Sequence, residues 1–279
     1  MKTKQRIATL LCVTLVAGAL GGCGGNGGDG NTDNASQGLF VDAPVSGLEY
    51  TSGTFSGITG PNGEFSFLPG EQVEFFIGDI ALGMATGDTV VTPLDLFSDA
   101  TDVNDPRVIN LLRLLQTLDV DGIPDNGIVI TPETREQAVD ISIDFSVPIA
   151  DFAGNPELLN LLGAVTNVSE LVDAPAAIAH FQQTMAALRE DLIAQVVAAG
   201  QIRVVVETPS EADLQTLLDQ FAQAGMPLVT VEVDGTTLVT TVDLQQLNQL
   251  FSSPLVREVD DFRPVDPNPP GTDPQSSTG

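Results

Sequence analysis

Short runs of alternating apolar and polar residues fill the chain from residue 39 to about residue 91. An alternation with period two is typical of half-buried strands, and the Gly-Pro-Asn-Gly segment at 60–63 is a strong turn signal. This pattern predicts a small β-sandwich over residues 39–103. We expect its core to come from six phenylalanines, which are Phe40, Phe55, Phe65, Phe67, Phe75 and Phe76.

The apolar spacing changes to steps of three and four in the region 104–200, which predicts helices. Three helices are expected to begin where a capping residue precedes proline: Asp105-Pro106, Thr131-Pro132 and Asn155-Pro156. The longest expected helix covers 175–199 and ends at Gly200. Its apolar residues fall on one stripe, namely Ile178, Phe181, Met185, Leu188, Leu192 and Val196.

The region 201–257 mixes both periods. A strand is expected at 202–206, a helix from the capping signal at Ser210, and a hairpin over 228–242 around the tight Asp-Gly turn. A last helix is expected to open at Asp243. This β-α-β-β-α order predicts a small layer of helices on a sheet, so the fold class is α+β. The acidic, proline-rich residues 258–279 are predicted to be a disordered tail.

A lipoprotein signal is predicted at the N-terminus. A basic start precedes an apolar run at 7–19, which is too short to span a bilayer. The segment Leu20-Gly21-Gly22-Cys23 that follows resembles the lipobox of bacterial lipoproteins. This resemblance implies removal of residues 1–22, lipidation of Cys23 and, because Gly24 replaces the inner-membrane aspartate, a lipid anchor in the cell outer membrane. The glycine- and asparagine-rich remainder of 23–38 is predicted to be a flexible tether.

A second resemblance concerns the first strands. The segments Asp42-Ala43-Pro44-Val45 and 57–67 are similar to the carboxypeptidase-regulatory-like and Cna-B-like β-sandwiches of secreted bacterial proteins, with Gly60 where those usually carry aspartate. A family of Gram-negative lipoproteins begins in the same way. In such families the module is structural or adhesive, so the resemblance implies a role without catalysis.

Charge and composition exclude several functions. The chain contains ten Lys and Arg residues and 38 Asp and Glu residues, which gives a net charge of −28. This negative charge repels nucleic acid. No lysine follows residue 4, the one mature cysteine is Cys23, and the one histidine is His180. Lysine, thiol and multi-histidine zinc chemistry are therefore excluded. His180 is either a lone general base or, as we prefer, a partly buried helix residue that hydrogen-bonds locally.

One acidic segment has the composition of a cation site. Residues 119–126, which we call the acidic turn, bring together four oxygen donors, Asp119, Asp121, Asp125 and Asn126. Hard cations such as Ca²⁺ prefer such donors on a tight turn. The segment resembles the D-x-D-G-x-P-D segments of calcium-binding secreted repeats, although its glycine arrives too early for an EF-hand. The alternative is a turn whose aspartates cap backbone amides.

These features predict a lipid-anchored outer-membrane protein that serves as a non-enzymatic envelope or surface binding or scaffold module. Its anchor would contact the membrane, and its partner would be a protein or a glycan. The alternative is a carboxylate-dependent hydrolase of envelope or extracellular polymers. Two facing acids about 5 to 9.5 Å apart in a deep groove would favour the hydrolase.

Overall fold

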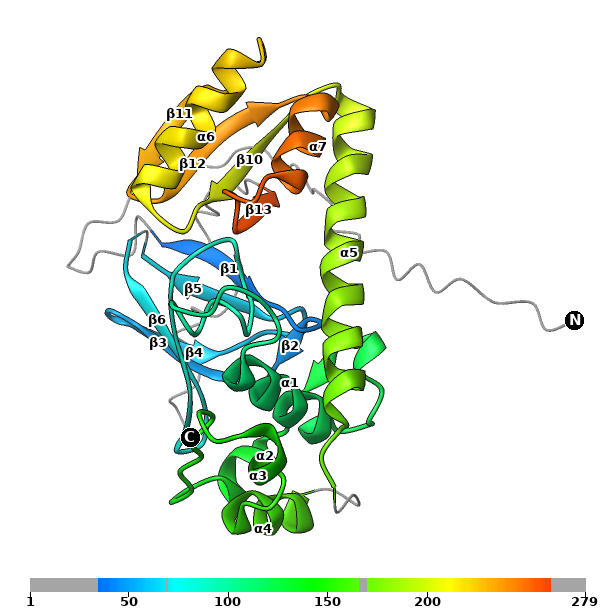
Figure 1. Cartoon of the computed structure of the whole chain (residues 1–279). Helices are drawn as coiled ribbons and strands as arrows, with labels where there is room; N and C mark the ends of the chain where they lie inside the picture. The colour runs from blue at the N-terminus through cyan, green and yellow to red at the C-terminus, as the bar shows by residue number, and fades with distance from the viewer. Residues whose placement is uncertain (1–34, 69, 166–169, 262–279) are drawn as a thin grey trace, which may run out of the picture. The chain divides into compact units, whose positions relative to one another are not determined.

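The computed structural model describes residues 35–68, 70–165 and 170–261, and their fold is α+β, as predicted (Figure 1). The predicted signal peptide, Cys23, most of the tether and the tail beyond residue 261 lie outside the described residues. The strands are β1 (Ser36–Phe40), β2 (Val45–Ser46), β3 (Glu49–Ser52), β4 (Phe55–Ile58), β5 (Glu64–Phe67), β6 (Gln72–Ile77), β7 (Ile80–Thr86), β8 (Val90–Val91), β9 (Ile128–Val129), β10 (Ile202–Glu207), β11 (Val229–Asp234), β12 (Thr237–Val242) and β13 (Glu258–Asp261). The α-helices are α1 (Pro106–Leu118), α2 (Pro132–Gln137), α3 (Ile149–Phe152), α4 (Pro156–Val165), α5 (Ala174–Ala199), α6 (Glu211–Gln223) and α7 (Leu244–Ser252).

The first strands form two sheets, in the orders β5-β1-β8 and β4-β3-β6-β7. Aromatic rings from the two sheets meet: the ring of Phe75 on β6 lies 4.7 Å from that of Phe40 on β1 and 5.1 Å from that of Phe65 on β5. Phe67 is also buried, whereas Phe55 and Phe76 are only partly buried. Four of the six expected core phenylalanines therefore build this core.

Strand β1 begins inside the predicted tether, so the boundary at residue 38 is wrong. Ser36 to Leu39 pair antiparallel with β5. A side chain on Gly38 would overlap the Phe65 ring and the Asp88 carbonyl oxygen. Gly38, which was counted with the glycine-rich tether, instead lets Phe65 of β5 and the backbone at Asp88 lie close to this strand.

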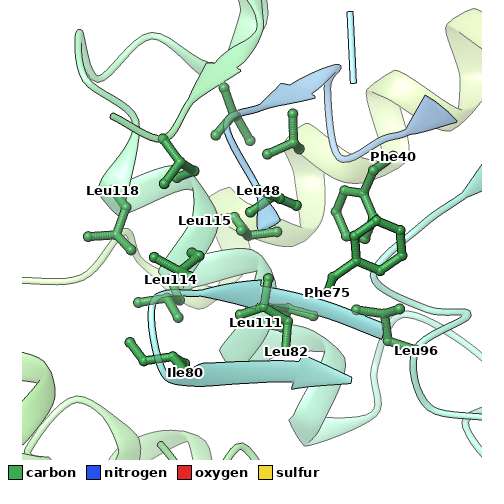
Figure 2. Packing of buried hydrophobic residues seen from close by; sticks show 14 of the residues in the cluster. Phe40, Leu48, Phe75, Ile80, Leu82, Leu96, Leu111, Leu114, Leu115 and Leu118 are labelled. Atoms are coloured by element: carbon green, nitrogen blue, oxygen red, sulfur yellow. The ribbon is translucent and has the colours of Figure 1, made fainter. Parts of the chain in front are cut away.

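Helix α1 packs against the sheets and is enclosed on every side, since each residue from Val108 to Leu118 is buried. Figure 2 shows Leu111, Leu114 and Leu115 of this helix in one core with Phe75 and strand residues. Strand β9, from the predicted helical region, also pairs in parallel with β2. The predicted boundary between residues 103 and 104 therefore does not separate two cores. The strands before it and helix α1 after it bury their apolar residues against each other.

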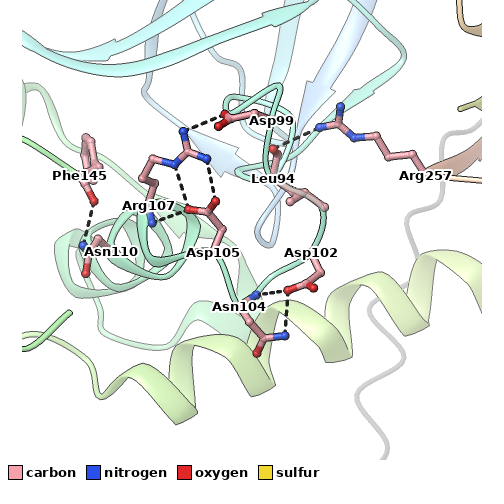
Figure 3. Close-up of polar contacts among 9 residues, drawn as sticks. All are labelled: Leu94, Asp99, Asp102, Asn104, Asp105, Arg107, Asn110, Phe145 and Arg257. Atoms are coloured by element: carbon pink, nitrogen blue, oxygen red, sulfur yellow. Dashed lines mark hydrogen bonds and ion pairs between the residues drawn. The ribbon is translucent and has the colours of Figure 1, made fainter. Parts of the chain in front are cut away.

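Helices α1, α2, α6 and α7 begin at predicted caps. The side chains of Asp105, Thr131 and Ser210 accept hydrogen bonds from the first turns of α1, α2 and α6, and Asp243 forms a full capping box with Gln246. Figure 3 shows how Arg107 reinforces the start of α1: its Nη2 lies 2.7 Å from Asp105 and its Nη1 lies 2.8 Å from Asp99.

The C-terminal sheet has the order β11-β12-β10-β13. Leu214, Leu217 and Phe221 of α6 and Leu247 and Leu250 of α7 pack on it, together with Leu192 and Val196 of α5. The predicted hairpin corresponds to β11 and β12, joined at the Asp-Gly turn. The other end of α5 belongs to a different core, where Ala177 and Phe181 contact Val108 and Leu112 of α1.

Strand β13 corrects the predicted start of the tail. Residues 258–261 pair antiparallel with β10, and Val206 of β10 lies opposite Val259. The acidic composition of this segment predicted disorder. Strand β10 nevertheless supplies hydrogen-bond partners for its backbone, and the local sequence does not reveal them. Within the described residues, no helix is both long enough and apolar enough to cross a membrane.

Candidate functional site

The acidic turn is closed by its own hydrogen bonds. Asp119 is buried at the end of α1, and its carboxylate accepts hydrogen bonds from the Ile123 and Val129 amides, each at 2.9 Å. Asp121 also accepts from the Ile123 amide, at 2.9 Å, and from the Asn126 side chain, at 3.0 Å. These contacts match the alternative in which aspartates cap backbone amides. Calcium binding by Asp119, Asp121, Asp125 and Asn126 stays a prediction.

Asp125 lies beside a histidine from a distant part of the chain. Its side chain is 74% exposed, and its Oδ1 lies 3.6 Å from Nε2 of His180 on helix α5. The opposite ring nitrogen of His180, Nδ1, lies 3.4 Å from Oδ1 of Asp42. The structure thus places the imidazole between one exposed and one fully buried carboxylate.

Asp42 is the partner that sequence reasoning missed. It follows β1, has no exposed surface, and accepts hydrogen bonds from the Gln116 amide at 3.0 and 3.2 Å. Burial raises the pKa of Asp42 above its ordinary value, although the hydrogen bonds from His180 and Gln116 oppose this shift. The only sequence signal was its place in the Asp42-Ala43-Pro44-Val45 motif, which was assigned to a strand and not to a site.

His180 carries a raised pKa for a related reason. Burial disfavours its charged form, but the hydrogen bond and charge of Asp42, with the charge of Asp125, outweigh burial and raise the pKa. Both ring nitrogens face carboxylates, so neither is directed at a hydroxyl nucleophile. The residue is partly buried, as we preferred, but its side-chain partners are distant in sequence and not local.

We expect the stabilisation from His180 to depend on pH. A histidine whose pKa is raised on folding contributes stability that is fully present below about pH 6.5 and is lost as the pH rises through the folded-state value. The melting temperature of the wild type should therefore exceed that of His180→Gln most at pH 6 and least at pH 8. Because this is the one histidine of the chain, its imidazole NMR signals report the pKa directly. A pKa at or below 6.5, or a difference that does not vary with pH, would contradict this assignment.

A groove lies between helices α6 and α7, with a volume of about 480 Å³. None of its lining residues is charged, and all of them are polar except Phe221 and one proline. The lining residues are Gln220, Phe221, Gln245, Asn248, Gln249, Ser252, Ser253 and Pro254. Amide and hydroxyl groups both donate and accept hydrogen bonds, so the groove suits an uncharged polar ligand.

Sequence reasoning also missed three carboxylates that the tertiary structure brings together. Asp95, Glu207 and Glu258, which we call the carboxylate cluster, offer oxygen atoms that all lie within 4.8 Å of one another. In the described part of the chain, this is the one group of three or more such residues close enough to hold a metal ion. Its members come from three distant segments, so no spacing in the sequence signals it.

Comparison with known proteins adds no family to this geometry. No protein-family model matches the chain, and neither the curated proteins nor the solved structures include a match.

Proposed function

We propose that this protein is a lipid-anchored outer-membrane lipoprotein that acts as a non-enzymatic binding or scaffold module of the cell envelope, with an uncharged glycan as the ligand of its C-terminal layer. The anchor rests on the lipobox-like segment that ends at Cys23. The ligand class rests on the groove between α6 and α7.

The chemistry of the groove supports this ligand class. Gln245 and Asn248 are exposed along α7, while Phe221 is buried and gives the groove an apolar side. A chain with a net charge of −28 repels anionic ligands at long range, and the groove itself offers no charge to a cationic one. An uncharged ligand rich in hydroxyl groups fits both conditions.

The hydrolase alternative is less well supported. Two acids facing each other across a groove would favour it, but no carboxylate lines the groove between α6 and α7. A second groove, along β3 and β4, is lined by a single acid, Glu49. In the carboxylate cluster, the Oδ1 atom of Asp95 and the Oε1 atom of Glu258 are buried, so the cluster gives a polymer little access.

An array of uncharged glycans tests the proposed ligand class. We expect the full-length protein to bind one group of them, and the double variant Gln245→Ala with Asn248→Ala to bind it at least about tenfold more weakly. Loss of two hydrogen bonds of about 1 kcal/mol each predicts this change. Gln215→Ala is the matched control, because this exposed amide of α6 lies outside the groove lining and bonds to Asp219. Absence of binding by the wild type, or equal binding by the double variant, would reject the glycan assignment.

A further inference from the structure

The carboxylate cluster places like charges directly opposite each other in a sheet. Glu207 at the end of β10 and Glu258 at the start of β13 are register partners. Like charges in this position are destabilising. Asp95, from the segment after β8, adds a third carboxylate to the same place. Something must offset this repulsion for β13 to pair with β10.

Two further acids increase the local negative charge. The Glu207 carboxyl donates a hydrogen bond to the Asp88 carboxylate, and the charge of Asp260 acts on Glu258. Burial, with the charges of Asp88 and Asp95, raises the pKa of Glu207 to about 8. Burial, with the surrounding carboxylates, raises the pKa of Glu258 well above its ordinary value.

Arg257 pairs with Asp95 and its charge acts on Glu207, but Oε1 of Glu258 stays without a partner. Its Nη2 lies 3.1 Å from Oδ1 of Asp95. The same Nη2 donates a hydrogen bond to the Leu94 carbonyl at 3.3 Å (Figure 3). Its Nε has no hydrogen-bond partner although it is buried. One guanidinium therefore faces several carboxylates.

Two oxygen atoms in the cluster remain without hydrogen bonds. Oε1 of Glu258 is completely buried and accepts no hydrogen bond, although the residue as a whole is only partly buried. Oδ1 of Asp95 is likewise buried, and its one printed contact is the ion pair with Arg257 at 3.1 Å, while Thr92 donates its amide and hydroxyl to the other oxygen, Oδ2, at 2.8 and 2.6 Å. A buried acceptor without a partner is costly, and Oε1 of Glu258 is such an acceptor on a residue of the carboxylate cluster.

We propose that Asp95, Glu207 and Glu258 bind a hard divalent cation, Ca²⁺, which joins strand β13 to the end of β10 and to the segment after β8. An all-oxygen ligand set favours Ca²⁺, Mg²⁺ or Mn²⁺ over Zn²⁺. Calcium–oxygen distances of about 2.3–2.6 Å place two ligands of one ion up to about 5 Å apart, which accommodates the 4.8 Å limit of the cluster. The cation also supplies the missing partner for the buried Oε1 of Glu258 and further positive charge beside Asp95.

Calcium titration of the full-length protein tests this site. Isothermal titration calorimetry should give one fewer Ca²⁺ per chain for Glu258→Gln than for the wild type. At a tenfold excess over a dissociation constant on the order of 10⁻⁴ to 10⁻³ M, Ca²⁺ should raise the wild-type melting temperature by about 3 to 6 °C. Glu258→Gln should lose this increase. Its cation-free melting temperature should equal or exceed that of the wild type, because glutamine replaces an acid whose ionisation is disfavoured by burial and by the neighbouring carboxylates.

Three further variants make the result decisive. Glu207→Gln provides a second test at the opposite position in case Glu258→Gln does not fold, and it should also bind one Ca²⁺ fewer. Glu232→Gln, on the exposed strand β11, should keep the wild-type stoichiometry. Asp121→Ala reports separately on the acidic turn. An unchanged wild-type melting temperature in Ca²⁺, or wild-type stoichiometry in both glutamine variants, would overturn the proposal and leave the acids to share protons instead.

Discussion

Replacing Cys23 by serine is expected to move the protein from the membrane fraction to the soluble fraction. In the lipobox-like segment Leu20-Gly21-Gly22-Cys23, the sulfur and the amine of Cys23 are the predicted acylation sites. A single acyl chain gives only marginal membrane binding, with an association constant of about 10⁴ M⁻¹, whereas several chains anchor firmly. Loss of all of them should change the partition between membrane and water by several orders of magnitude. Fractionation of cells, followed by mass measurement of the N-terminal fragment, checks this result.

Cys12 provides the matched control for this experiment. It lies in the apolar run of the predicted signal peptide, so Cys12→Ser should leave the mature protein unchanged and membrane-bound. A mature protein that carries an unmodified Cys23, or a Cys23→Ser variant that stays with the membranes, would show that the lipoprotein prediction is wrong.

Phe75→Ala is expected to lower the free energy of unfolding by about 3–5 kcal/mol, the usual cost of truncating a buried phenylalanine. Phe75 has no exposed surface and lies between the rings of Phe40 and Phe65, which belong to the other sheet. Its removal leaves a cavity where the two sheets meet, next to the buried leucines of α1 (Figure 2). Urea unfolding followed by circular dichroism measures the change.

Met84→Ala is the corresponding surface control. Met84 lies on β7 of the same sheet, and the residue is 51% exposed. The loss should therefore be within about 1 kcal/mol, since little buried contact is removed. Equal effects of the two substitutions would mean that the packing between the two sheets does not stabilise the fold.

The groove and the carboxylate cluster lead to independent experiments. The groove is formed by α6, α7 and the two residues after α7, whereas the cluster depends on β10, β13 and the segment after β8. Glycan binding can therefore fail while calcium binding succeeds, and the reverse also holds.

Local interactions made much of the secondary structure predictable from the sequence. Asp105-Pro106, Ser210 and Asp243 begin helices because each side chain bonds to a backbone amide two or three residues later. The Asp-Gly turn at 234–235 sets the register of its hairpin in the same way. These contacts need no partner from elsewhere in the chain, so the α+β class, these helix starts and this hairpin followed from the sequence by itself.

Contacts between distant segments were decided only by the tertiary structure. The two-residue strands β2 and β9 pair across more than 80 positions through backbone groups that every residue carries. Strand β13 likewise exists because β10 offers it a free edge. His180 meets Asp42 across 138 positions, and Asp95, in the segment after β8, meets Glu207 and Glu258 of the C-terminal sheet. In a chain with 38 acidic residues, no spacing distinguishes the carboxylates that folding brings together, because their proximity results from how the sheets and helices pack.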